Sequence, residues 1–165
     1  MDFNNPTELT QMFPTLSLGD VPDEVILRVF SNLEIKDFIR CGQVSKRIRA
    51  ISQDQSLWLR IDLYKEKSLA AGFLEYVLNN GCKYLGLGLA QIAQIDGESL
   101  KCNPSQLKCL DLSFCRGSLQ IFDDLLSSCH SLEKLALTSQ FHIFQNKELV
   151  KTMCHQFGAT LQVLD

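Results

Sequence analysis

The sequence predicts a mixed α/β chain, in which three short helices precede a solenoid of parallel strands and helices. Three observations predict this order. Residues 1–18 show no period, residues 19–63 carry apolar side chains at helical spacing, and residues 64–165 repeat a leucine pattern with a step of 25–29 residues. We therefore expect an N-terminal tail, a small helical domain and an array of repeats.

Composition places the chain among ordinary globular proteins. Of its 165 residues 45% are apolar and 21% charged, and 16 basic against 19 acidic residues give a net charge of −3. This balance gives no electrostatic case for nucleic acid, and no apolar run approaches the ~18 residues of a membrane span, so neither is expected as a partner. Because no Lys or Arg precedes Arg28, a secretory signal or mitochondrial presequence is not expected either.

The cysteine pattern favours a reducing compartment. There are seven cysteines, an odd number, and no C-x-x-C pair. We expect the cytoplasm, the nucleus or both, and the cysteines do not decide between them.

The tail of residues 1–18 is interrupted by Pro6 and Pro14 and keeps neither a helical nor an alternating period. We expect it to be disordered. Its few apolar residues leave a short docking motif open as an alternative.

Residues 19–63 carry the sequence signals of three short helices. Pro22 suits a first helical position, and the two acidic residues after it favour the positive end of the helix dipole. The apolar stripes are Val25, Ile26, Val29, Phe30 and Leu33; Ile35, Phe38 and Ile39; and Val44, Ile48 and Ile51. The first stripe is wide for so short a helix, and about 45 residues bury too little surface to hide it. The surplus indicates a partner, and each large side chain it covers would contribute ~1.5–3 kcal/mol.

The order of residues in this segment is specific. It runs from a Pro-x-Glu start through the apolar helix and a basic stretch to Leu-Trp, with Pro22, Glu24, Val25, Ile26, Val29, Phe30, Leu33, Phe38, Val44, Lys46, Arg47, Leu57 and Trp58 in register. In this order the segment resembles an F-box. It departs from the family pattern at Val21, where Leu is usual, and at Ile48, where many members carry Trp; both residues stay apolar.

The resemblance implies a partner. F-box domains dock on the S-phase-kinase-associated adaptor of SCF-type ubiquitin ligases, and through it reach the cullin and RING subunits. The residues so implied to bind the adaptor are Val21, Pro22, Glu24, Val25, Ile26, Val29, Phe30, Leu33, Phe38, Val44, Ile48 and Trp58. No cofactor is implied.

The second part of the chain repeats one pattern. "LKCLDLSFC" at 107–115 fits L-x-x-L-x-L-x-x-C without a mismatch, and "LEKLALTSQ" at 132–140 repeats it with Gln140 in the place of Cys115. "WLRIDL", "CKYLGLGLA" and the final "LQVLD" extend the starts to 58, 82 and 161. Helical stripes lie between, at 70–78, 119–126 and 149–157. The register of "CKYLGLGLA" stays open, because Leu85, Leu87 and Leu89 also alternate.

One strand and one helix in ~20–29 residues resembles the leucine-rich repeat. The resemblance implies a right-handed solenoid with parallel strands on the concave face and helices on the convex face. Its concave candidates for binding a protein substrate are Lys108, Asp111, Ser113, Glu133, Lys134, Thr138 and Gln162, and plain solvent exposure stays equally open for each. Because "LQVLD" stops inside a unit and nothing after Asp165 caps it, we expect an array cut within the solenoid.

The remaining candidates for chemistry have structural explanations. Cys129-His130 and Cys154-His155 suggest metal ligands, but their separation equals the repeat step, so we expect them at helix ends and predict no metal site. Nothing marks any cysteine as a catalytic thiol. The run "KRIR" at 46–49 is expected to form a solvated or adaptor-facing side of a helix.

Together the two resemblances imply the non-catalytic substrate-recognition subunit of an SCF-type (cullin-RING) E3 ubiquitin ligase, which holds a protein for ubiquitination and proteasomal degradation. A second hypothesis is a repeat scaffold or short isoform that occupies the adaptor without presenting substrate. The third and weakest is an enzyme that carries ubiquitin on one of its cysteines.

Overall fold

The computed structural model describes residues 17–93, 99–102, 104–140, 143, 145–158 and 163–164. The predicted tail therefore lies outside the described residues except for its last two, and so do Leu161, Gln162 and Asp165 of the final "LQVLD". The chain divides into two compact units between Asp54 and Gln55. The sequence placed this boundary later, at 63/64.

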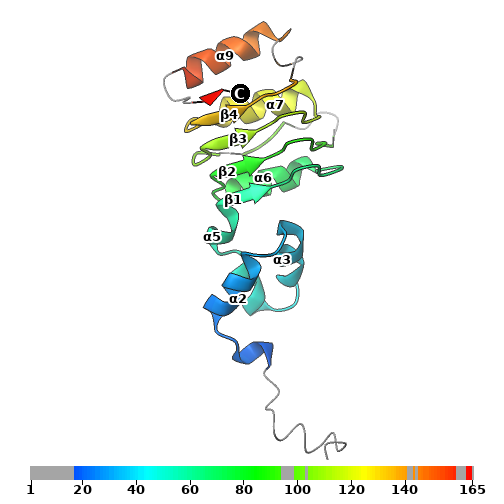
Figure 1. Ribbon diagram of the computed structural model, residues 1–165, viewed down its shortest axis with the longest axis vertical. Coiled ribbons are helices and arrows are strands. Elements are labelled where there is room, and N and C mark those ends of the chain that lie inside the picture. Colours follow the sequence, from blue (N-terminus) through cyan, green and yellow to red (C-terminus); the bar gives the residue numbers. More distant parts are fainter. Residues whose placement is uncertain are drawn as a thin grey trace, which may run out of the picture. The chain divides into compact units, whose positions relative to one another are not determined.

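The first unit holds the three predicted helices behind a short 3-10 turn (Figure 1). The elements are η1 (Leu18–Asp20), α2 (Asp23–Phe30), α3 (Ile35–Cys41) and α4 (Lys46–Ser52). Pro22 was predicted to be the first helical residue, but it is the N-cap of α2, whose first helical residue is Asp23. Ser45 caps α4, where its hydroxyl accepts a hydrogen bond from the backbone N–H of Ile48 at 3.2 Å.

One apolar core joins these helices. Each of α2, α3 and α4 contributes one pair of buried apolar side chains, namely Ile26 and Phe30, Ile35 and Phe38, and Ile48 and Ile51. The rings of Phe30 and Phe38 stack with centroids 6.4 Å apart. Since the pairs are spaced by three or four residues, each helix turns one stripe to this core.

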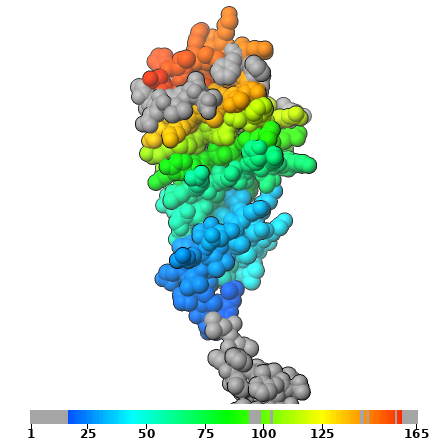
Figure 2. Space-filling view, viewed as in Figure 1, coloured from blue at the N-terminus to red at the C-terminus, as the bar shows by residue number. Residues whose placement is uncertain are grey.

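The second unit is built on a parallel sheet of five strands, which follow one another in chain order (Figure 1). Its elements are α5 (Gln55–Trp58), β1 (Arg60–Asp62), α6 (Ala71–Asn79), β2 (Tyr84–Gly86), β3 (Cys109–Asp111), α7 (Leu119–Ser128), β4 (Lys134–Ala136), α9 (Lys147–Phe157) and β5 (Val163–Leu164). The space-filling view shows them as successive bands of colour from green to orange (Figure 2). All three predicted helical stripes are helices, and all five predicted strands pair.

The strand register confirms the predicted step. Arg60 pairs with Tyr84, Tyr84 with Cys109, Cys109 with Lys134, and Lys134 with Val163. The inward column is Ile61, Leu85, Leu110 and Leu135, each at most 4% exposed. The open register is also decided, because Leu87 is fully buried whereas Leu89 is 43% exposed.

Candidate functional site

Helix α2 has two apolar faces. Ile26 and Phe30 lie one turn apart and are 4% and 5% exposed, in the core of the first unit. Val25 and Val29, also one turn apart, are 50% and 54% exposed. Leu33 extends the exposed stripe beyond the helix end, at 37%. The wide stripe seen in the sequence is thus two stripes, of which only one is covered within the unit.

The structure separates the predicted adaptor contacts into exposed and buried residues. Pro22, Glu24, Val25, Val29, Leu33 and Val44 are exposed, and Val21 is half-buried. Ile26, Phe30, Phe38 and Ile48 are at most 5% exposed. These four are core residues rather than contact residues, because a side chain already packed in its own unit has no surface left for a partner.

Trp58 needs the same correction. It is 1% exposed and belongs to the second unit, where its ring and that of Tyr76 in α6 form a T-shaped pair with centroids 5.1 Å apart. Trp58 therefore anchors α5 to the sheet unit, and this contact also explains why the unit boundary precedes it. Sequence reasoning assigned Trp58 to adaptor binding from its place in the motif, which does not show what the ring packs against.

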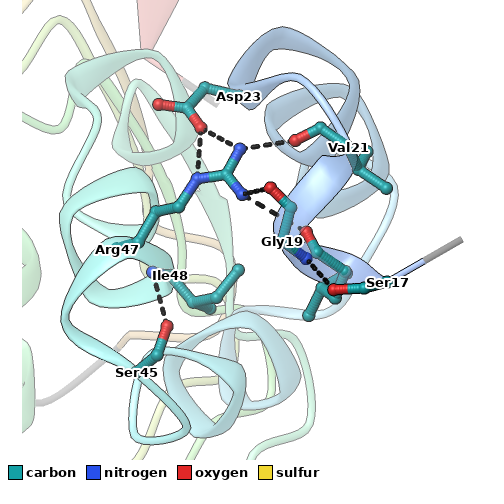
Figure 3. A network of polar contacts seen from close by, with 8 residues as sticks. Ser17, Gly19, Val21, Asp23, Ser45, Arg47 and Ile48 are labelled. Atoms are coloured by element: carbon teal, nitrogen blue, oxygen red, sulfur yellow. Dashed lines mark hydrogen bonds and ion pairs between the residues drawn. The ribbon is translucent and has the colours of Figure 1, made fainter.

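Arg47 fixes the chain segment that leads into α2 (Figure 3). Its Nε donates to Asp23 Oδ1 at 2.8 Å, and one Nη donates to the carbonyl oxygen of Gly19 at 2.8 Å. Further guanidinium N–H groups donate to the carbonyls of Leu18 and Val21. Arg47 was expected on a solvated or adaptor-facing helix side, and the structure instead uses it to position η1 and Val21. Its partners stand 24 to 29 residues away, so no local pattern could reveal them.

The second unit has a hollow on the open face of its sheet. This open face is formed by the strand residues that point away from the core. Its volume is about 420 Å³. The predicted substrate residues Asp111 and Lys134 line it. Of the others, Ser113 is half-buried, Thr138 is exposed, and Gln162 lies outside the described residues.

Two of the predicted substrate residues are engaged with each other. Lys108 Nζ lies 2.7 Å from Glu133 Oε1, and this hydrogen bond and the carboxylate charge raise the pKa of Lys108. Asp111 Oδ1 accepts the backbone N–H of Ser113 at 2.8 Å, so that carboxylate also shapes the strand end. The predicted set is therefore not a row of independent contacts.

Most residues lining the hollow were missed by sequence reasoning. Arg60, Asp62, Tyr64, Tyr84, Gly86 and Gly88 come from β1, β2 and the residues that follow them. A Cβ on Gly86 would lie 2.9 Å from Asp62 Oδ1, and one on Gly88 would lie 3.0 Å from the Tyr64 ring. The two glycines thus let these side chains lean over the sheet. The repeat step carried the signal, because these positions precede the predicted ones by one to three steps.

Four thiols, those of the buried Cys82, Cys115 and Cys129 and of the half-buried Cys102, are poorly suited to nucleophilic chemistry. Burial raises the pKa of Cys82 and Cys102 to about 11, and that of Cys115 and Cys129 to about 12. A reactive thiol needs the opposite shift, because the thiolate is the nucleophile. Within the described ranges no three His, Cys, Asp or Glu side chains are grouped to hold a metal ion. Nor is any helix there long and apolar enough to cross a membrane.

Comparison with known proteins agrees with this geometry. Residues 18–64, which include η1 to α5 and also β1, match the family described as F-box-like, so the chain carries an F-box-like domain. Over 47 residues it is 40% identical to mouse (Mus musculus) "F-box/LRR-repeat protein 12". This match covers 28% of the chain and 14% of the relative. Both findings support an F-box protein, a class whose members are generally non-catalytic.

Proposed function

We propose that this chain is the substrate-recognition subunit of an SCF-type (cullin-RING) E3 ubiquitin ligase. Its F-box-like domain docks on the S-phase-kinase-associated adaptor and through it on the cullin and RING subunits. One observation carries the proposal, namely that Val25 and Val29 form an uncovered apolar stripe on α2, inside the segment that matches the F-box-like family. Two half-exposed valines at this spacing are an incomplete interface, which the adaptor would cover.

The second unit is proposed to be a leucine-rich-repeat solenoid that holds a protein substrate. Supporting this are the parallel strands in chain order and the steps of 24, 25, 25 and 29 residues between register positions 60, 84, 109, 134 and 163. The substrate would contact the open face at Asp111, Ser113, Lys134 and Thr138 and at the Lys108–Glu133 pair. The chain supplies no chemistry, and transfer of ubiquitin gains from proximity alone, leading to proteasomal degradation. We place this activity in the cytoplasm, the nucleus or both.

Co-purification with the adaptor tests the docking surface. The double variant Val25→Asp/Val29→Asp changes two exposed side chains and is expected to lose the adaptor while keeping its helical circular dichroism. Phe30 is unsuitable for this test, because a charge there would disrupt the core of the unit. Leu119→Asp is the matched control, since Leu119 is 43% exposed in the other unit and should leave adaptor binding intact. Retention of the adaptor by the double variant would refute the docking surface.

A reconstituted ligase separates the receptor from a scaffold. The complex of chain, adaptor, cullin and RING subunits is assayed for transfer of ubiquitin to proteins that co-precipitate with the chain. A receptor promotes transfer in proportion to adaptor binding. A chain that binds the adaptor and promotes no transfer would instead support a scaffold that only occupies it.

A further inference from the structure

Four residues at one repeating position adopt a left-handed backbone. Lys65, Leu89, Phe114 and Ser139 have φ of 60°, 58°, 56° and 60°. They are 24, 25 and 25 residues apart. The backbone N–H groups of the first three of these residues each donate to a carbonyl oxygen of the following repeat at 2.9 Å. The turn is therefore fixed by backbone hydrogen bonds, and the fold requires a left-handed residue there but no particular side chain.

Leu89 and Phe114 are unexpected at this position. Glycine and asparagine adopt the left-handed region most readily, whereas bulky side chains are strained in it. Burial does not compensate, because Leu89 is 43% and Phe114 is 49% exposed. Neither backbone preference nor core packing within the described residues accounts for two large apolar side chains in adjacent repeats. A contact outside the chain would account for both.

The two side chains line one groove, which we call the Leu89–Phe114 groove. Its volume is about 630 Å³, and its lining also includes Lys65, Lys67 and Arg116, with Glu66 as the acidic member. Three cations against one anion make this surface positive, although the chain as a whole carries −3. The groove thus combines two large apolar side chains with a net positive lining.

We propose that the Leu89–Phe114 groove binds an extended peptide segment in which a large apolar residue stands next to Asp or Glu. The apolar residue would cover Leu89 and Phe114, and the carboxylates would meet Lys67 and Arg116. This deepens the proposed function by naming the chemistry of the substrate segment, and it rests on that function for its biological meaning. The groove is separate from the hollow on the open face, with which it shares no lining residue.

Panning of the full chain with a displayed library of random 12-residue peptides tests the groove. The variant Leu89→Asn/Phe114→Asn serves as counter-selection, because asparagine suits the left-handed backbone and should leave the fold at least as stable. Enriched peptides are expected to pair Leu, Ile or Phe with Asp or Glu. A synthetic peptide of the enriched sequence should bind the double variant at least about tenfold more weakly in fluorescence polarisation.

Two further variants identify the source of binding. Leu119→Asn, at the same 43% exposure outside the groove, is expected to bind the peptide like the wild type. Lys67→Ser/Arg116→Ser should weaken binding and flatten its dependence on salt. Equal binding of the peptide by the wild type and the asparagine variant would overturn the proposal, as would enrichment of basic peptides or of none.

The outcomes also separate this proposal from the proposed function. Peptide binding is measured without the adaptor, and co-purification with the adaptor is measured without the peptide. Loss of adaptor binding with intact peptide binding refutes the receptor and leaves the groove. Intact adaptor binding without peptide enrichment refutes the groove, and a dimer that dissociates in the asparagine variant would assign it to a second copy of this chain.

Discussion

The side-chain amide of Gln140 donates hydrogen bonds to the carbonyl oxygens of Cys115 at 2.8 Å and Leu112 at 2.6 Å, both in the preceding repeat of the second unit. Gln140 is 1% exposed and stands in the same repeat position as Cys115. It therefore supplies a donor to the Cys115 carbonyl and a second donor to the Leu112 carbonyl, which also accepts the backbone N–H of Cys115 at 3.0 Å. Consecutive repeats are joined here by a polar contact as well as by the columns of buried leucines.

We expect Gln140→Met to destabilise the second unit by about 1–3 kcal/mol. The substitution keeps the length of the side chain but removes the side-chain donor of the buried Cys115 carbonyl, whereas the Leu112 carbonyl still accepts the backbone N–H of Cys115 at 3.0 Å. Urea unfolding followed by circular dichroism measures the change in the free energy of unfolding. Gln106→Met, at an exposed glutamine, should change it by less than about 0.5 kcal/mol. Equal stability of the two variants would show that these hydrogen bonds contribute nothing.

Arg47 leads to a second prediction, because its guanidinium joins Asp23 to three backbone carbonyls. Arg47→Lys keeps the charge but loses the planar fork, so we expect it to cost about 1–2 kcal/mol, nearly as much as Arg47→Ala. Arg40→Lys is the control, since Arg40 pairs with an exposed carboxylate at 3.4 Å, and its replacement should change stability little.

Amide hydrogen exchange gives the local readout for Arg47. Residues 18–23 should exchange faster in Arg47→Lys than in the wild type, while the amides of α3 should keep their protection. If exchange rises evenly over the whole first unit, Arg47 stabilises the unit as a whole and does not specifically hold η1.

The repeat register could be predicted from sequence because two periods coincide in it. Alternating leucines define the strands, and a step of about 25 residues superimposes them, so the pairing of Leu110 with Leu135 followed directly. The register of the strand that holds Leu85, Leu87 and Leu89 could not be predicted in this way. Alternation alone continues through all three, and only the left-handed turn at Leu89 ends the strand pattern.

The candidate site was less predictable than the fold. A motif position gives the residue type but not its burial, so Phe30 and Val29 were assigned the same role although one is 5% and the other 54% exposed. The helical period separates such residues only once the direction of the core is known. Contacts of Arg47 and Trp58 are set by tertiary packing, for which the local sequence holds no signal.

Two glycines are expected to respond oppositely to alanine. Gly72 lies near the start of α6, and a Cβ added there would meet no atom within 4 Å, so Gly72→Ala should stabilise the unit by about 0.5–1 kcal/mol. At Gly86 the added Cβ would lie 2.9 Å from Asp62 Oδ1, which accepts the backbone N–H of Tyr64 at 3.0 Å. Gly86→Ala should therefore displace that carboxylate and cost about 1 kcal/mol. Thermal unfolding of both variants provides the comparison, and a stabilised Gly86→Ala would show that Asp62 moves freely.

The buried thiols make stability fall at alkaline pH. Burial, with a smaller contribution from Cys102, raises the pKa of Cys129 from 9.0 to about 12. In the unfolded chain the thiol ionises near 9, whereas the folded chain keeps its proton, so the unfolded state binds fewer protons between these values. The stabilising contribution of Cys129 is complete below pH 9 and is lost as the pH rises toward 12, by up to ~1.4 kcal/mol per pH unit.

The cysteine variants isolate this effect as a slope. Cys129→Ala removes one titrating thiol and also leaves a cavity, but the cavity lowers stability equally at every pH. In urea unfolding between about pH 8 and 10.5 the variant should therefore lose stability less steeply than the wild type, even though it starts lower. Cys154→Ala, at an exposed cysteine, should run parallel to the wild type. If the curve of Cys129→Ala is also parallel, Cys129 ionises alike in both states, and its burial is less complete in solution than its 0% exposed fraction indicates.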